Sequence, residues 1–317
     1  MTGEGVHRVL VTGGAGFIGS HVVDALARSG YSVKVLDDLS CGDLDNIGVH
    51  LRSGLVEFFE GDIRDRGLVE EVLAGVDAVV HLAALVSVPL SVEDPEFTFD
   101  VNVNGTRNVV ASCASSGVKK LVFASSCAVY GEAQYLPINE AHPRRPLSPY
   151  ASSKLEGERV CWNFAEDSDA DVAILRFFNV YGPRQTTGDY SGVITKFFDW
   201  AEKGESLVVY GDGSQTRDFV YVSDVAQAIL MLLESRSVGG VFNIGYGEAV
   251  TISDLALKII ALVGKDVGVV YRPPRKGDIP RSLADISKAR KAFGFSPRVS
   301  LDEGLRRLLR WREGSLR

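Results

Sequence analysis

A tyrosine and a lysine one helical turn apart are the residues of this chain best suited to proton chemistry. Tyr150 and Lys154 lie near the start of a stretch with helical spacing, so their side chains share one face. A phenol normally titrates near pH ~10, too high for a base at neutral pH. A nearby ammonium favours the phenolate and lowers its pKa. Spacing alone favours a surface tyrosine beside a solvated lysine, but with the glycine-rich turn and the small residues Ser125 and Ser126 elsewhere in the chain the pair predicts an acid/base site.

A glycine-rich turn near the N-terminus predicts a site for an anion. The apolar run 9–11 is typical of a strand buried on both faces, and glycines follow it where a helix begins. The free N–H groups of that helix point at the turn, and the expected anion is the pyrophosphate of a dinucleotide. The residues expected at the turn are Gly13, Gly16, Phe17, Ile18 and Gly19. A purely structural turn is the alternative.

An acidic residue after the second strand indicates which dinucleotide binds. Asp37 ends the predicted strand 32–37, roughly 20 residues after the glycines, where a carboxylate accepts hydrogen bonds from both adenosine ribose hydroxyls. This carboxylate repels a 2′-phosphate, and no arginine stands beside it in the sequence. The sequence therefore predicts NAD rather than NADP, with Asp38 in the same site.

Alternating strands and helices in the first half predict the sheet that positions these residues. The alternation implies a Rossmann-type, doubly wound parallel sheet with helices on both faces. Ligands of such α/β folds bind beyond the carboxyl ends of the strands, where Ser126 also falls. The expected strands are 8–12, 32–37, 55–60, 77–82, 118–124 and 171–178, and the expected helices are 17–29, 65–74, 95–116 and 148–166.

The second half predicts a smaller α/β lobe that covers the cleft. We expect an NAD-binding domain at 1–180, carrying the catalytic residues, and a substrate lobe at 181–317, with the two interleaved. The expected helices of this half are 191–203, 223–234, 252–263, 285–293 and 300–313, and the expected strands are 207–210, 216–222, 241–244 and 267–271.

The composition limits the classes of function. The 317 residues are 45% hydrophobic and carry a net charge of −7, which disfavours a nucleic-acid or anionic-membrane surface. No apolar run approaches the ~20 residues of a membrane span, and residues 1–7 lack the apolar core of a signal peptide, so we expect a cytoplasmic protein. The four cysteines show neither zinc-site nor disulfide-framework spacing, and no metal is expected: Cys41, Cys113, Cys127 and Cys161.

Three motifs together resemble the nucleotide-sugar epimerases of the extended short-chain dehydrogenase/reductase superfamily, of the UDP-glucose 4-epimerase type. They are Gly-Gly-Ala-Gly-Phe-Ile-Gly at 13–19, Tyr-Ala-Ser-Ser-Lys at 150–154 and Asn-Val-Tyr-Gly-Pro-Arg-Gln at 179–185. The resemblance covers nearly the whole chain. It implies catalysis by Ser126, Tyr150 and Lys154; further NAD contacts from Asp62, Ile63, Ala83, Ala84, Asn102, Tyr150 and Lys154; and UDP-sugar contacts from Ser126, Asn179, Arg217, Arg275, Asp278 and Ser282.

The reaction implied by the resemblance is NAD-dependent 4-epimerisation of a UDP-sugar through a transient 4-keto intermediate. Sugar dehydratases of the superfamily place an acid pair after the active-site hydroxyl, whereas this chain has Cys127 and Ala128, and the missing glutamate also disfavours uronic-acid decarboxylation. Val86 departs from epimerases that have a cofactor-contacting lysine there. The open alternatives are a UDP-glucuronate 4-epimerase, a nucleotide-sugar reductase or dehydratase, and a non-catalytic dinucleotide sensor.

Residue 282 bears on which sugar is expected to bind. Ser282 matches a position that a bulky side chain fills in hexose-restricted epimerases, so a serine implies room for an acetamido group; an exposed loop serine is the alternative.

Helices 95–116 and 148–166 carry apolar residues on more than one face, and a sheet covers only one. Matching helices pair across a two-fold axis in this superfamily, which implies a homodimer. The apolar residues in question are Val101, Val109, Val110, Val160 and Trp162.

Overall fold

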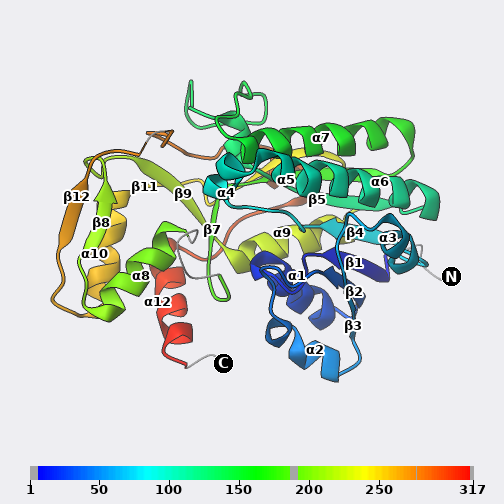
Figure 1. The fold of residues 1–317 in the computed structure, drawn as a ribbon, viewed down its shortest axis with the longest axis horizontal. Helices are drawn as coiled ribbons and strands as arrows, with labels where there is room; N and C mark the ends of the chain where they lie inside the picture. The colour runs from blue at the N-terminus through cyan, green and yellow to red at the C-terminus, as the bar shows by residue number, and fades with distance from the viewer. Residues whose placement is uncertain (1–5, 186–191, 276, 315–317) are drawn as a thin grey trace.

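A wholly parallel, seven-stranded sheet forms the centre of the molecule (Figure 1). The computed structural model describes residues 6–185, 192–275 and 277–314. The strand order is β10-β6-β5-β4-β1-β2-β3, and it reverses between β1 and β4. This order confirms the Rossmann-type fold. The strands are β1 (Arg8–Thr12), β2 (Ser32–Asp37), β3 (Val56–Glu60), β4 (Ala78–His81), β5 (Lys120–Ser126), β6 (Asp171–Phe177) and β10 (Gly240–Ile244).

Helices cover both faces of this sheet, which explains the continuous apolar runs in its strands. In β1, Val9 and Val11 pack into one hydrophobic core and Leu10 into the other, and all three are fully buried. One core lies under α1 (Phe17–Arg28), α9 (Val222–Glu234) and α11 (Ser287–Phe293). The other lies under α3 (Arg66–Val72), α6 (Gly105–Ser116) and α7 (Pro149–Asp167).

The helix expected at 95–116 is interrupted. It consists of α5 (Pro95–Phe99), a π-helical turn η2 (Asp100–Asn104) and α6. A π turn holds one residue more than an α turn, and such bulges often lie at functional sites. Four further short helices were not predicted from the sequence: η1 (Leu44–Asn46), α2 (Gly48–Arg52), α4 (Val88–Glu93) and η3 (Cys127–Tyr130).

The smaller lobe has its own hydrophobic core. A three-stranded sheet has the order β11-β9-β7, and β12 pairs with β8. The strands are β7 (Asn179–Tyr181), β8 (Leu207–Tyr210), β9 (Thr216–Tyr221), β11 (Ala249–Thr251) and β12 (Val269–Arg272), and the helices are α8 (Val193–Lys203), α10 (Ile252–Val263) and α12 (Leu301–Arg312). Residue 191, where the first of these helices was expected to begin, lies outside the described residues.

The chain crosses between the two lobes more than once. After β7 it enters the smaller lobe, yet α9 and β10 return to the large sheet. A domain boundary at residue 180 therefore stays a prediction. Among the described residues, no helix combines the length and the apolar character needed to cross a membrane.

Candidate active site

The glycine turn between β1 and α1 is shaped to accept an anion. Gly13 adopts φ +70°, and a Cβ on Gly19 would lie 2.0 Å from the Gly13 carbonyl oxygen, so only glycine lets α1 start this close to the turn. Gly16 is the N-cap of α1, and no side chain of the described residues caps this helix. The first turn of α1 also has no acidic residue. The N–H groups of Phe17 and Ile18 can therefore face a pyrophosphate, and the turn fits NAD.

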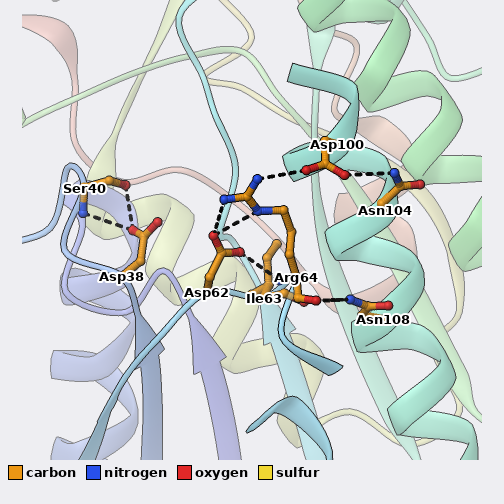
Figure 2. Close-up of polar contacts among 8 residues, drawn as sticks. All are labelled: Asp38, Ser40, Asp62, Ile63, Arg64, Asp100, Asn104 and Asn108. Carbon is orange, nitrogen blue, oxygen red and sulfur yellow. Dashed lines mark hydrogen bonds and ion pairs between the residues drawn. The ribbon is translucent and has the colours of Figure 1, made fainter. Parts of the chain in front are cut away.

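Asp37 lies against this turn. Its Oδ2 accepts a hydrogen bond from the Ala15 N–H (3.0 Å), and its Oδ1 accepts one from the Leu39 N–H (2.9 Å). Burial raises the pKa of the Asp37 carboxyl, and these N–H donors oppose the rise. Asp38 is exposed and accepts hydrogen bonds from Ser40 in its own loop (Figure 2). Asp37 is thus the carboxylate that the fold brings to the turn.

The loop after β3 carries Asp62 and Ile63, and Arg64 holds it in place (Figure 2). Arg64 Nε and Nη2 donate to Asp62 Oδ2 at 2.9 and 2.6 Å, and Nη1 donates to Asp100 Oδ2 at 2.8 Å. The hydrogen bonds from Arg64 lower the pKa of Asp62. Arg64 was not identified from the sequence; its place between Asp62 and Asp65 was the available signal.

Asn102 links the segment after β4 to α7. Its Oδ1 accepts from the Leu85 N–H (2.8 Å), and its Nδ2 donates to the Leu85 carbonyl (3.0 Å) and to Ser153 Oγ (2.9 Å). Asn102 is buried and lies in the π turn. Ala83 and Ala84 directly follow β4, at the point where the strand order reverses. These three predicted residues therefore lie near the reversal of the strand order, where such folds bind dinucleotides.

The first turn of α7 fixes the predicted catalytic pair. Ser148 is the N-cap, its Oγ accepts from the Ala151 N–H (3.1 Å), and Pro149 occupies the first helical position. Tyr150 and Lys154 follow one turn apart on the same helix. The local sequence thus sets the direction in which both side chains leave the helix.

Ser126 at the end of β5 meets this pair. The Tyr150 hydroxyl is hydrogen-bonded to Ser126, and Lys154 Nζ donates to the Ala124 carbonyl (2.9 Å). Burial raises the pKa of Tyr150 to about 12, against the effect of the Ser126 hydrogen bond, and burial lowers the pKa of Lys154 to about 8. Lys154 is not among the groups that shift the pKa of Tyr150, so the expected lowering by Lys154 is not found.

Arg217 and Asp278, both predicted to contact the nucleotide, are ion-paired. Arg217 Nη1 donates to the Thr216 and Ile279 carbonyls at 2.9 and 2.7 Å, and Nη2 pairs with Asp278. The Arg217 side chain is largely buried, unlike that of a solvated loop arginine.

Arg275 and Asn179 lie close to this pair. The Asp278 N–H donates to the Arg275 carbonyl (3.2 Å), and the Arg275 guanidinium stacks 3.8 Å from the centre of the Tyr210 ring. Asn179 Nδ2 donates to the Asp218 carbonyl (3.0 Å) on the neighbouring strand. The four predicted nucleotide-binding residues therefore gather around β9.

Ser282 belongs to the same region. Its N–H donates to the Thr216 carbonyl (3.1 Å), next to Arg217. Ser282 is only 1% exposed, and its Oγ has no hydrogen-bond partner among the described residues. An exposed loop serine is therefore the wrong interpretation, and a buried hydroxyl without a partner is unusual.

A buried polar network behind the site was not predicted from the sequence. Glu158, on α7 one turn after Lys154, accepts from Ser125 Oγ (2.5 Å) and pairs with Arg176 (2.8 and 2.6 Å). Arg176 Nη1 donates to the Tyr130 hydroxyl (3.0 Å), which donates to Asn243 Oδ1 (2.6 Å). The network joins β5, α7, β6 and β10, and it holds the end of β5 that carries Ser126, the predicted catalytic serine.

Comparison with known proteins agrees with this geometry. The model of the NAD dependent epimerase/dehydratase family matches residues 9–245. The UDP-glucose 4-epimerase of Mycolicibacterium smegmatis is 39% identical over 302 residues, which cover 94% of this chain and 96% of the relative. Decarboxylases and dehydratases also occur among the relatives, and solved relatives include complexes with NAD.

Two solved structures show the same fold throughout. The UDP-glucose 4-epimerase of Thermotoga maritima with UDP-glucose superposes with a TM-score of 0.92 at 38% identity, covering 98% of this chain and 100% of that one. The UDP-N-acetylglucosamine 4-epimerase of Methanobrevibacter ruminantium with UDP-N-acetylmuramic acid gives 0.93 at 38%, with coverage of 98% and 100%. This chain therefore belongs to the NAD dependent epimerase/dehydratase family, as an NAD-using enzyme of the epimerase type.

Proposed function

We propose that this enzyme interconverts UDP-glucose and UDP-galactose, and also the N-acetylated pair, by epimerisation at C4. The observation that carries the proposal is that Tyr150 and Lys154 both reach the carboxyl end of β5, where Tyr150 contacts Ser126 and Lys154 donates to the Ala124 carbonyl. We assign NAD binding to residues 1–180 and nucleotide-sugar binding to 181–317, with the substrate diphosphate on Arg217 and Arg275. Guanidinium forks suit phosphate oxygens.

The side chains divide the proposed chemistry among themselves. Bound NAD supplies a hydride acceptor and donor for C4 of the sugar. Tyr150 takes the proton of the sugar 4-OH and later returns it, while Ser126 hydrogen-bonds the same oxygen as its charge changes. Lys154 provides the nearby ammonium that favours the phenolate. Tight anchoring of the diphosphate with loose sugar contacts allows the ketone to present its other face.

The residues after Ser126 favour epimerisation over elimination or decarboxylation. Ala128 has no proton to transfer, and burial raises the pKa of the Cys127 thiol to about 12. Neither side chain can serve as the acid that loss of water requires. The charge of Arg217 also acts on Cys127, which supports one site shared by the end of β5 and the proposed nucleotide-binding residues.

A substrate panel tests the proposed reaction. The purified protein is incubated with UDP-glucose, UDP-N-acetylglucosamine, UDP-glucuronate and dTDP-glucose, and the products are identified by NMR. Epimers formed without net NADH support epimerisation. Net consumption of NADH indicates a reductase, a 4-keto-6-deoxy product indicates a dehydratase, and conversion of UDP-glucuronate alone indicates the uronic-acid epimerase.

Substitution of Ser282 tests the assignment of the sugar. Wild-type enzyme is expected to accept UDP-N-acetylglucosamine alongside UDP-glucose, and Ser282→Tyr is expected to lose the acetylated activity by a factor of roughly ten to a hundred, because overpacking rejects the larger group. The measurement is kcat/KM on both substrates.

The matched variant Ser282→Ala keeps the space and should retain both activities, and thermal unfolding of both variants separates sugar selection from loss of fold. If wild-type enzyme leaves the N-acetylated pair untouched, or if Ser282→Tyr slows both substrates equally, the role of Ser282 in sugar selection is wrong.

A homodimer through α6 and α7 is also proposed, because this face of the molecule is grooved and exposes Trp162. Trp162 on α7 is 44% exposed, whereas Val109 and Val110 are buried within their own chain and do not contribute to the surface as expected. One groove between the helices is lined by Ala114, Val160 and Phe164. A two-fold axis brings the same surface of a second copy onto it.

The dimer is tested by light scattering at micromolar concentration. Wild-type protein should show twice the 34.3 kDa mass of the chain, and Trp162→Glu should shift it toward monomer. Leu257→Glu, at an apolar position on α10 that is more exposed than Trp162 (60% against 44%), should stay dimeric. A monomeric wild type counts against the proposal.

A further inference from the structure

Arg64 joins two parts of the cofactor crevice that are distant in the sequence (Figure 2). Its guanidinium pairs with Asp62, in the loop after β3, and with Asp100, in the π turn. Asp100 Oδ1 in turn accepts from Asn104 Nδ2 (3.0 Å). We call Asp62, Arg64, Asp100 and Asn104 the Arg64 clasp. All three nitrogen atoms of the guanidinium donate hydrogen bonds, so the position of the group is well determined.

A second contact holds the backbone of the same loop. Asn108 Nδ2, on α6, donates to the Ile63 carbonyl (3.3 Å) and the Arg64 carbonyl (2.8 Å). The loop is thus tied to η2 through a side chain and to α6 through its main chain. The same π turn carries Asn102, which hydrogen-bonds Ser153 on the catalytic helix.

The clasp leaves the Asp62 carboxylate ready for one more donor. Its Oδ1 accepts from the Arg64 N–H (2.8 Å), and its Oδ2 accepts from Nε and Nη2 of the same residue. A carboxylate has about four acceptor sites, so one remains. The resemblance implies that Asp62 and Ile63 flank the adenine, whose amino group is a donor of the required kind.

The clasp is too exposed to matter much for folding. The side chains of Arg64, Asp62 and Asp100 are 36%, 30% and 44% exposed, and ion pairs at such positions contribute little to stability. We propose that Arg64 is a positioning residue that preorganises the loop 62–63 for the adenosine half of NAD and thereby slows loss of the cofactor. Preorganisation of a binding loop removes the ordering that binding otherwise requires.

Calorimetric titration with NAD, in the absence of any sugar, tests the positioning role. Arg64→Ala is expected to raise the Kd for NAD about tenfold. Arg66→Ala is the matched control. Arg66 lies two residues from Arg64 and forms an exposed ion pair with Glu70, so this variant removes the same charge but leaves the Arg64 clasp intact. It should change the Kd for NAD less than about twofold. Both variants should unfold at nearly the wild-type temperature.

Asp100→Asn separates positioning from simple attraction of the anionic cofactor. This substitution removes a negative charge, so attraction alone predicts tighter binding of NAD. Loss of the clasp predicts weaker binding, by several-fold. Tighter or unchanged binding by Asp100→Asn overturns the proposal, as does an equal effect of Arg64→Ala and Arg66→Ala.

Binding of two fragments of NAD shows which half of the cofactor the Arg64→Ala substitution affects. ADP-ribose contains the adenosine half and should lose affinity for Arg64→Ala by the same factor as NAD, whereas nicotinamide mononucleotide lacks it and should bind as it does to wild type. Equal weakening for both fragments overturns the proposal. None of these measurements depends on the sugar that the enzyme converts, so they remain decisive if the proposed epimerisation fails.

Discussion

The Tyr150→Phe enzyme is expected to convert its UDP-sugar roughly 10²–10⁴ times more slowly than wild type, the usual contribution of a positioned acid/base group. The ring stays in place, and only the hydroxyl that meets Ser126 is lost. Lys154 cannot take over as the base while it is an ammonium, because an ammonium has no lone pair to accept the proton; its Nζ donates to the Ala124 carbonyl (2.9 Å). The measurement is kcat by NMR, together with the Kd for NAD, which should stay close to wild type.

Tyr31→Phe provides the comparison. Tyr31 directly precedes β2. It therefore lies at the amino ends of the parallel strands, whereas the site lies at their carboxyl ends. Its loss of a hydroxyl should leave kcat unchanged. Near-normal turnover by Tyr150→Phe on any accepted UDP-sugar contradicts the role given to this phenol.

The Arg176→Met enzyme is expected to lose about 3–5 kcal/mol of the free energy of unfolding, because it leaves a carboxylate buried without its cation. Arg176 and Glu158 are 1% and 3% exposed, and they bond through two N–H groups at 2.8 and 2.6 Å. Urea titration followed by tryptophan fluorescence measures the loss.

Arg159→Met, on the exposed side of the same helix, removes an ion pair with Glu156 (2.8 Å) and should lower the free energy of unfolding by less than about 1 kcal/mol. Joint replacement of Arg176 by Met and Glu158 by Leu should recover part of the loss, since no lone buried charge remains. Equal urea midpoints for Arg176→Met and Arg159→Met contradict the importance of the buried pair.

The large sheet was predictable because its strands are apolar on both faces. The run 9–11 fits only a strand with a core on each side, and the structure places its residues in two cores. The interruption of helix 95–116 was not predictable, because apolar spacing does not reveal a π turn. That turn accompanies the contacts of Asn102 with Leu85 and Ser153, which lie far from it in the sequence.

The contacts of the candidate site were likewise predictable from the sequence only in part. Spacing within one helix was enough to pair Tyr150 with Lys154. Spacing could not pair Arg217 with Asp278 or Glu158 with Arg176, because each pair joins separate elements that only the complete fold brings together. Nor could it show that Ser282 is buried, since serine occurs equally in exposed loops.

The return of β10 to the large sheet bears on how the chain is made. During synthesis, β6 stays an open edge until residues 240–244 emerge to pair with residues 173–177, long after the predicted NAD-binding half is complete. An unpaired apolar strand is a template for association between chains. A chain that ended at residue 180 would present that edge permanently and would lack Asn243, the last member of the buried network. The open edge of β6 is therefore protected from association with other chains only after residues 240–244 have been synthesised and paired with it.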